Sequence, residues 1–311
     1  MESWLLVPVL GAAIGTDLGL TLLMGLALTM FGPANALSGV LTSSSSTLVL
    51  AAIAALYLIE TLLEQVSVTI MALWHAAQML ARPLAGFLLA WLMSDGAPAV
   101  ERLFAAVVMA VIASAVHTGA VGWQAFLRLS GVPRRTRWIA SLSEDVAVVA
   151  LLVLGLENAA VAFALLLTLG IVGLPLHLSS IAAFQLLVQG VVGDARRLIE
   201  LGSWWQADLL PDWLIRRYPT PDSEALTLKG TPAALLEISP RRLRYGWLVS
   251  TASEAEFMTR FRGRTPLSQA SSMHFEEQQL FTRIELADNL VAFVPPGGPT
   301  APELESAFLK R

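Results

Sequence analysis

The chain has 311 residues, of which 55% are hydrophobic and only 14% are charged, and its mean hydropathy is +0.65. Soluble domains carry about 25% charged residues, so this composition excludes an ordinary soluble protein and indicates a polytopic membrane protein. Because the chain has no cysteine, disulfides, thiolate metal sites and a catalytic thiol are excluded as well.

Charge divides the sequence into two regions. Residues 1–193 contain 6 arginines, no lysine and 9 acidic residues, whereas residues 194–311 contain 14 basic and 15 acidic residues. We therefore expect a transmembrane helical domain over residues 1–193, followed by a polar region.

The first apolar run covers residues 4–31, and about 20 residues suffice to cross a hydrocarbon core, so it is predicted to be one span. Gly11, Gly15 and Gly19 recur at every fourth position, which gives one helix face a smooth surface for close packing. That face serves either packing within one chain or a seam between copies in a homo-oligomer. Asp17 lies on the same helix near mid-membrane depth, where a carboxylate is costly, and we expect it to face protein or water.

A second span is predicted from about Thr47 to Val66. Glu60 and Glu64 lie near its end, four residues apart and therefore on one helix face. Either they are solvated at headgroup level, or they form a buried pair that binds a cation or relays protons.

The next apolar piece, residues 68–93, is interrupted by Arg82-Pro83. Proline lacks a backbone donor and disfavours helical geometry in the residue before it, which predicts a break between two half-helices. Irregular backbone at membrane depth must be buried in protein or line water, so a re-entrant or broken helix pair is expected here. The guanidinium of Arg82 would seek carboxylates.

A third span, residues 102–127, contains His117. It is followed by residues 128–138, which hold four of the six arginines of the membrane region. The positive-inside rule places this loop in the cytoplasm.

Glu144 and Asp145 follow two serines, Ser141 and Ser143. They either sit at a serine-capped helix start, where acids suit the helix dipole, or contribute to a polar intramembrane site. Residues 158–192 are apolar but broken at Gly173-Leu174-Pro175, giving one span plus a half-helix or two connected spans. The prediction is four to six spans in all.

Residues 194–220 combine aromatic and basic side chains, which favour the inner membrane–water interface. The interfacial residues are Trp204, Trp205, Trp213, Arg216 and Arg217.

Residues 221–311 alternate in short runs separated by turn signals, which predicts strands. With a C-terminal helix over residues 302–311, they form a small cytoplasmic α+β domain, either pleckstrin-homology-like or a generic β-rich domain. Arg241, Arg242 and Arg244 either face lipid headgroups or lie on a solvated strand edge.

Residues 10–175 resemble the uncharacterised membrane-protein family catalogued as domain of unknown function 4126. That family carries a Glu-x-x-x-Asp-Lys-x-Pro stretch, an Arg-Pro-x-x-Gly motif, a helix headed by His with basic residues on the following turns, and a Ser-Leu-x-Glu-Asp motif. The matching positions are Glu60, Arg82 to Gly86, His117, and Ser141 to Asp145.

The chain departs from this pattern mainly by losing positive charge. Glu64, Gln65 and Ser67 stand where the family has Asp, Lys and Pro, and Ala120 and Gln124 stand where basic residues follow the His. The resemblance does not reach the C-terminal domain and brings no settled activity with it.

Three functions are open. The first is a transport or channel-like protein of the bacterial inner membrane, with a polar intramembrane site. The second is a membrane anchor or assembly subunit whose residues 221–311 bind a protein partner or lipid headgroups. The third, an intramembrane enzyme, is the least supported, because no nucleophile–base, GxGxxG or Walker motif occurs. We expect no catalytic residue, metal, cofactor or nucleic-acid partner. The site residues are predicted to be Glu60, Glu64, Arg82, His117, Glu144 and Asp145.

Overall fold

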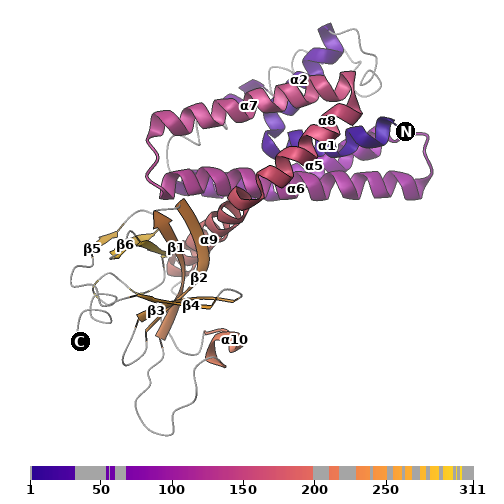
Figure 1. Cartoon of the computed structure of the whole chain (residues 1–311). Helices are drawn as coiled ribbons and strands as arrows, with labels where there is room; N and C mark the ends of the chain where they lie inside the picture. Colours follow the sequence, from indigo (N-terminus) through magenta and orange to yellow (C-terminus); the bar gives the residue numbers. More distant parts are fainter. Residues whose placement is uncertain are drawn as a thin grey trace. The chain divides into compact units, whose positions relative to one another are not determined.

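The structure is a computed structural model of the chain. It describes residues 2–31, 54–55, 57–59, 68–198, 210–216, 229–238, 241–250, 255–260, 263–267, 274–277, 281–286, 290–296, 299 and 302. The chain divides into two compact units, one of residues 1–124 and 132–177 and the other of residues 125–131 and 178–311. Figure 1 shows the elements along the chain.

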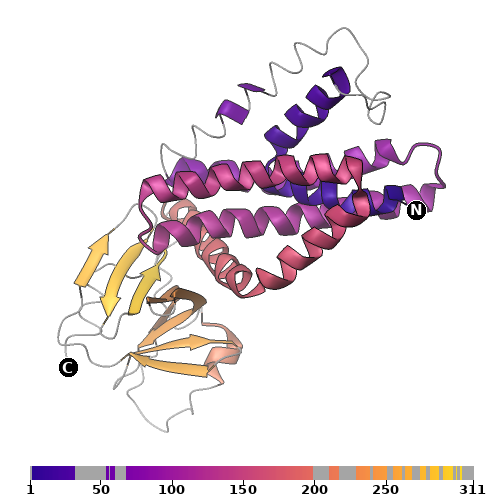
Figure 2. The same cartoon turned by 45° about the horizontal axis from the view of Figure 1, so that its top comes forward.

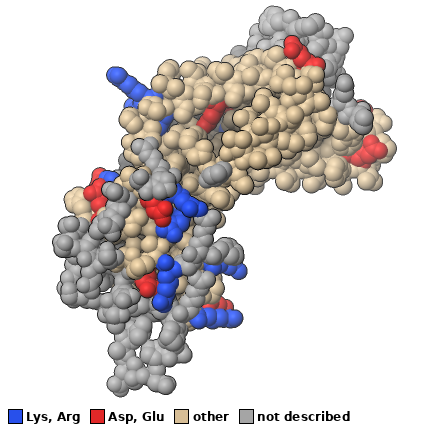
Figure 3. Space-filling model, in the orientation of Figure 1, with Lys and Arg blue, Asp and Glu red and all other residues tan. Residues whose placement is uncertain are grey.

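The helices of the N-terminal half are largely apolar. They are α1 (Glu2–Thr16), α2 (Leu18–Phe31), α5 (Val68–Met93), α6 (Ala99–Leu129), α7 (Arg134–Glu157), α8 (Ala159–Val172) and α9 (Leu174–Leu198). Four of them are long and apolar enough to cross a membrane, through Leu73–Met93 of α5, all of α6 and α7, and Leu176–Ala195 of α9. Charged side chains are sparse over the helices and frequent over the strands on the face in Figure 3. A membrane-embedded helical part followed by a β domain is therefore the coarse architecture.

The first apolar run is not one helix, as predicted, but two. Helix α1 ends at Thr16 and α2 begins at Leu18, so the break falls at Asp17. The two helices run in different directions in both views (Figures 1 and 2). Aspartate is a strong helix N-cap, and its side chain competes for backbone hydrogen bonds inside a helix, which explains a break at this position.

The break predicted at Arg82-Pro83 is wrong, because α5 continues through Pro83 to Met93. A proline removes one backbone donor, and helices packed in a membrane tolerate that loss. The break at Gly173 is present: α8 has 14 residues and α9 begins at Leu174. At about 1.5 Å per residue, α8 is too short to cross a 30 Å core alone.

Helix α7 begins at Arg134, directly after Pro133, and includes the serine–acid segment. The predicted helix start at Ser141 or Ser143 is therefore wrong. Pro133 supplies the start signal instead, since proline suits the first turn of a helix. Glu144 and Asp145 consequently lie well inside a helix rather than in its first turn.

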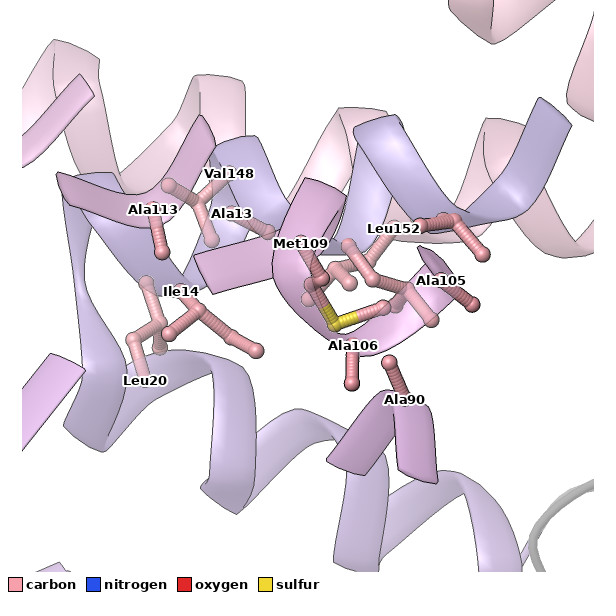
Figure 4. Packing of buried hydrophobic residues seen from close by; sticks show 12 residues of the cluster. Ala13, Ile14, Leu20, Ala90, Ala105, Ala106, Met109, Ala113, Val148 and Leu152 are labelled. Atoms are coloured by element: carbon pink, nitrogen blue, oxygen red, sulfur yellow. The ribbon is translucent and has the colours of Figure 1, made fainter. Parts of the chain in front are cut away.

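The core of the helical unit consists mostly of small side chains contributed by α1, α2, α5, α6 and α7. Figure 4 shows Met109 of α6 in the middle of this cluster, close to alanines of neighbouring helices. A Cβ added at Gly11 would lie 3.1 Å from the Met109 carbonyl oxygen, and one at Gly15 would lie 2.5 Å from that of Ala113. A Cβ at Gly19 would meet Tyr57. All three glycines thus face segments of their own chain, where close packing requires small residues.

The C-terminal residues form one seven-stranded antiparallel sheet. Its strands are β1 (Lys229–Ile238), β2 (Arg241–Ser250), β3 (Ala255–Thr259), β4 (Gly263–Leu267), β5 (His274–Glu277), β6 (Thr282–Leu286) and β7 (Leu290–Val294). The order β4-β3-β2-β1-β7-β6-β5 is that of a meander whose last strand returns to pair with the first.

Two apolar clusters stabilise this sheet. The larger includes Leu235, Leu248, Phe257 and Ile284. The smaller joins the short helix α10 (Asp212–Ile215) to β2 and β3 through Leu214, Val249 and Met258. The predicted C-terminal helix over residues 302–311 lies outside the described residues, apart from Pro302.

Candidate functional site

The break between α1 and α2 is the most polar place in the helical core. In an unbroken helix the carbonyl oxygens of Gly15 and Thr16 would accept hydrogen bonds from the backbone four residues on. Here both accept from Nη1 of Arg82, each at 2.6 Å. The guanidinium of α5 therefore caps the C-terminal end of α1.

Asp17 performs the matching role for α2. Its Oδ1 accepts a hydrogen bond from the backbone N–H of Leu20 at 2.7 Å, which is N-cap geometry. The backbone carbonyl of Asp17 also accepts from the hydroxyl of Thr21. Each charge suits the helix end that it meets, because the C-terminal end of a helix is partly negative and the N-terminal end partly positive.

Arg82 is almost completely buried, at 2% exposure. Its Nε donates to the side-chain carbonyl oxygen of Gln78, one turn earlier on α5. The buried cation is therefore surrounded by oxygen acceptors, as a charge in a low-dielectric interior must be.

Two histidines, one on α5 and one on α6, lie beside this arginine. Nε2 of His117 lies 3.3 Å from the carbonyl oxygen of His75, and the two rings are tilted, with centroids 5.6 Å apart. His117 is 1% exposed and His75 is 4% exposed.

Two acids of α7, Glu144 and Asp145, complete this group of polar side chains. Nε2 of Gln124 on α6 donates to both carboxylate oxygens of Glu144, at 3.2 and 3.3 Å. The hydroxyl of Tyr57 donates to Oδ2 of Asp145 at 2.9 Å. Gln124 thus holds one of the two carboxylates through the uncharged amide of its side chain.

These side chains line one cavity of about 40 Å³, which we call the break cavity. A water molecule needs roughly 10–15 Å³ on this measure, so the cavity accommodates a few waters and no organic molecule. Its lining residues are Thr16, Asp17, Tyr57, His75, Arg82, His117, Ala120, Val121, Gln124, Ser141, Glu144 and Asp145.

The lining is rich in acidic groups. Asp17, Glu144 and Asp145 provide three carboxyl groups, against the single guanidinium of Arg82. Within the described ranges, no group of three or more His, Asp or Glu side chains has the arrangement that holds a metal ion.

The comparison with protein families identifies the helical part. The model described as Domain of unknown function (DUF4126) matches residues 5–176, which is more than half of the 311-residue chain. The chain belongs to the DUF4126 family. No curated protein and no solved structure matches it. The DUF4126 match includes every residue that lines the break cavity and ends before the sheet begins.

The structure brings together Arg82, His117, Glu144 and Asp145, which were expected to share a site. Glu60 and Glu64, the acids expected to pair with Arg82, lie outside the described residues. Asp17 was expected only to face protein or water, and it is the residue at the break itself.

The residues predicted to lie at the interface are mostly outside the described ranges, namely Trp204, Trp205 and Arg217. Trp213 of α10 packs against the smaller apolar cluster of the sheet, and Arg216 follows it as an exposed C-cap. Within this DUF4126 chain, the side chain of Trp213 is therefore partly covered by protein.

Proposed function

We propose that the helical unit is the transmembrane part of a transport or channel-like protein that relays protons through the break cavity. The observation that carries this proposal is the convergence of three carboxyl groups, two histidines and one arginine on a cavity beside a broken helix. Interrupted helices and ionisable residues at membrane depth are typical of ion and proton pathways.

Protons are favoured over metal cations by the position of Arg82. In sites built on broken membrane helices, a cation binds the carbonyl oxygens left free at the break. Here Arg82 already occupies the carbonyl oxygens of Gly15 and Thr16. The groups that remain are titratable side chains and a space of water size, which is what a proton relay needs.

The proposed location is the bacterial inner membrane, with the sheet in the cytoplasm. The turn between α6 and α7 is flanked by four arginines, Arg128 at the end of α6 and Arg134, Arg135 and Arg137 at the start of α7, and such a cluster favours the cytoplasmic side. From that turn the chain crosses once through α7 and returns through α8 and the first turn of α9, which brings the sheet, in contact with α9 at Ser179, back to the same side.

The test is proton flux into liposomes that contain the purified full-length chain. A potassium gradient with valinomycin drives protons inward, and an enclosed pH-sensitive dye reports them. We expect uptake above that of protein-free liposomes, and loss of that uptake in Glu144→Gln. The matched control is Glu157→Gln, an exposed acid at the end of the same helix.

Two results would reject the proton relay. One is uptake equal to that of protein-free liposomes, provided that an added protonophore still collapses the gradient. The other is sodium or potassium flux in place of proton flux.

A second function is supported by the same arginine. Arg82 donates hydrogen bonds to two backbone carbonyls and one side-chain amide, which is the arrangement of a structural cap. On this alternative the polar core fixes the helix packing, and the chain is an anchor or assembly subunit whose sheet binds a protein partner or lipid. Wild-type protein without flux, together with a partner captured through residues 221–311, would favour it.

A further inference from the structure

A second and larger cavity lies wholly within the sheet-containing unit. It has a volume of about 670 Å³ and lies between the first turns of α9 and strand β2, and we call it the α9–β2 pocket. Ligand pockets in proteins usually measure roughly 300–1,000 Å³. This one is therefore large enough for an organic ligand, unlike the break cavity.

The pocket exists because β2 is longer than its neighbour β3. Strand β2 pairs with β1 along its whole length, but β3 pairs with it only from Trp247 to Ser250. Helix α9 contacts the remaining edge, where the backbone N–H of Leu243 donates to Oγ of Ser179 at 3.4 Å. Space remains beside that contact, next to an edge that proteins normally cover.

Part of the pocket wall is apolar and aromatic. Helix α9 contributes Leu178 and Ile181, and β2 contributes Tyr245 and Trp247. Burial raises the pKa of Tyr245 to about 12, so its phenol stays a neutral hydrogen-bond donor at ordinary pH. Trp213 of α10 completes the aromatic side.

The charge of the pocket is positive. Arg242 and Arg260 line it and are both exposed, and no acidic residue lines it within the described part of the chain. Arg242 forms no ion pair with any described residue. Arg244, by contrast, is paired with Glu237. An anionic group is therefore the ligand chemistry that these arginines recognise.

We propose that the α9–β2 pocket binds an anionic phospholipid. The phosphate lies against Arg242 and Arg260, and one acyl chain lies between α9 and the aromatic side chains. A free phosphate would use only the arginines, whereas a lipid also uses the apolar wall. That wall is part of a helix apolar enough to cross a membrane, and basic pockets beside such helices suit anionic headgroups.

The experiment uses the full-length chain in detergent, titrated with phosphatidylglycerol brominated on its acyl chains. Bromine quenches tryptophan fluorescence at short range, so bound lipid should quench Trp213 and Trp247. The chain has nine tryptophans, so we expect a saturable part of the quenching that disappears in the double variant Trp213→Phe, Trp247→Phe. Brominated phosphatidylcholine should bind at least tenfold more weakly, because its headgroup carries no net charge.

Two kinds of variant test the contacts of the lipid headgroup and of the acyl chain separately. Arg242→Gln with Arg260→Gln should weaken phosphatidylglycerol binding at least tenfold. Ile181→Trp should abolish it by filling the acyl-chain space without a change of charge. Arg283→Gln is the control for the loss of one positive charge, since Arg283 lies on β6 outside the pocket. All variants are first required to elute as the wild type in size exclusion.

Three results would overturn the proposal. Equal quenching by the two lipids would mean that no headgroup is recognised. Full competition by millimolar inorganic phosphate, with no effect of Ile181→Trp, would mean that the arginines take a free anion. Absence of saturable quenching in the correctly folded wild type would mean that no lipid binds.

Discussion

Arg82 and Asp17 cap the two helix ends that meet at the α1–α2 break. Arg82 donates to the last carbonyls of α1, and Asp17 accepts from the first turn of α2. The broken helix is thus closed by two charges of opposite sign, each placed at the helix end that it favours.

Replacing Arg82 with methionine should destabilise the helical unit strongly. The variant keeps most of the side-chain volume but leaves the carbonyls of Gly15 and Thr16 without their donor. Hydrogen bonds to a charged group contribute about 1.5–3 kcal/mol each, so we expect the loss of these two to cost about 3–6 kcal/mol. Thermal unfolding in detergent measures it. The control is Arg135→Met, at an exposed position near the start of α7, which should change stability by about 0.5 kcal/mol or less. Equal losses in the two variants would contradict the capping role of Arg82.

Variants of Asp17 separate its role as a helix cap from any role of its negative charge in proton transfer. Asparagine caps a helix nearly as well as aspartate, so Asp17→Asn should unfold like the wild type, while Asp17→Ala should lose about 1 kcal/mol. If the carboxylate takes part in a proton relay, Asp17→Asn should still lose proton uptake in liposomes. A stable Asp17→Asn protein with full uptake would leave Asp17 a cap and nothing more.

The close packing of α1 on α6 predicts a graded effect of glycine substitutions. A Cβ at Gly15 would lie 2.5 Å from the Ala113 carbonyl oxygen, so Gly15→Ala must move backbone and should cost about 1–3 kcal/mol. Gly11→Ala, with its nearest contact at 3.1 Å, should cost less.

The control for this series is Gly170→Ala on α8, where no atom lies within 4 Å of the added Cβ. Alanine favours a helix over glycine by up to about 1 kcal/mol, so this variant should be neutral or slightly stabilised. Unfolding midpoints measured in one detergent should therefore fall in the order Gly170→Ala, Gly11→Ala, Gly15→Ala, and the reverse order would reject the α1–α6 packing.

The residues of the break cavity are easier to predict from the sequence than the helix packing that brings them together. Charged and histidine side chains are rare in the apolar half, so Arg82, His117, Glu144 and Asp145 stand out without any structure. Their convergence depends on packing between helices far apart in sequence, which periodicity does not encode. Glu60 and Glu64 lie outside the described residues, and their place in the site stays a prediction.

The helix boundaries show where local signals compete. Pro83 does not break α5, because packing inside a helical bundle outweighs one missing backbone donor. Asp17 does end α1, and Thr16-Asp17 carries an N-cap signal in the middle of an apolar run. Pro133, two residues after Gly131 with φ of +69°, marks the turn before α7 better than the later serines do.

The proposed topology can be tested on the natural chain background, because the sequence has no cysteine. Single cysteines at exposed positions report which side of the membrane a loop occupies. Suitable sites are Ala99 after the α5–α6 turn, Thr136 after the α6–α7 turn, and His274 in the sheet. In intact cells a membrane-impermeant maleimide should label Ala99→Cys only. After permeabilisation it should label all three, because α6 separates the first site from the second and the chain crosses twice between the second and the third.

Labelling of His274→Cys in intact cells would place the sheet outside and would contradict the two crossings through α7 and through α8 with α9. Labelling of Thr136→Cys but not Ala99→Cys would reverse the whole orientation and would mean that the arginine cluster does not follow the positive-inside rule.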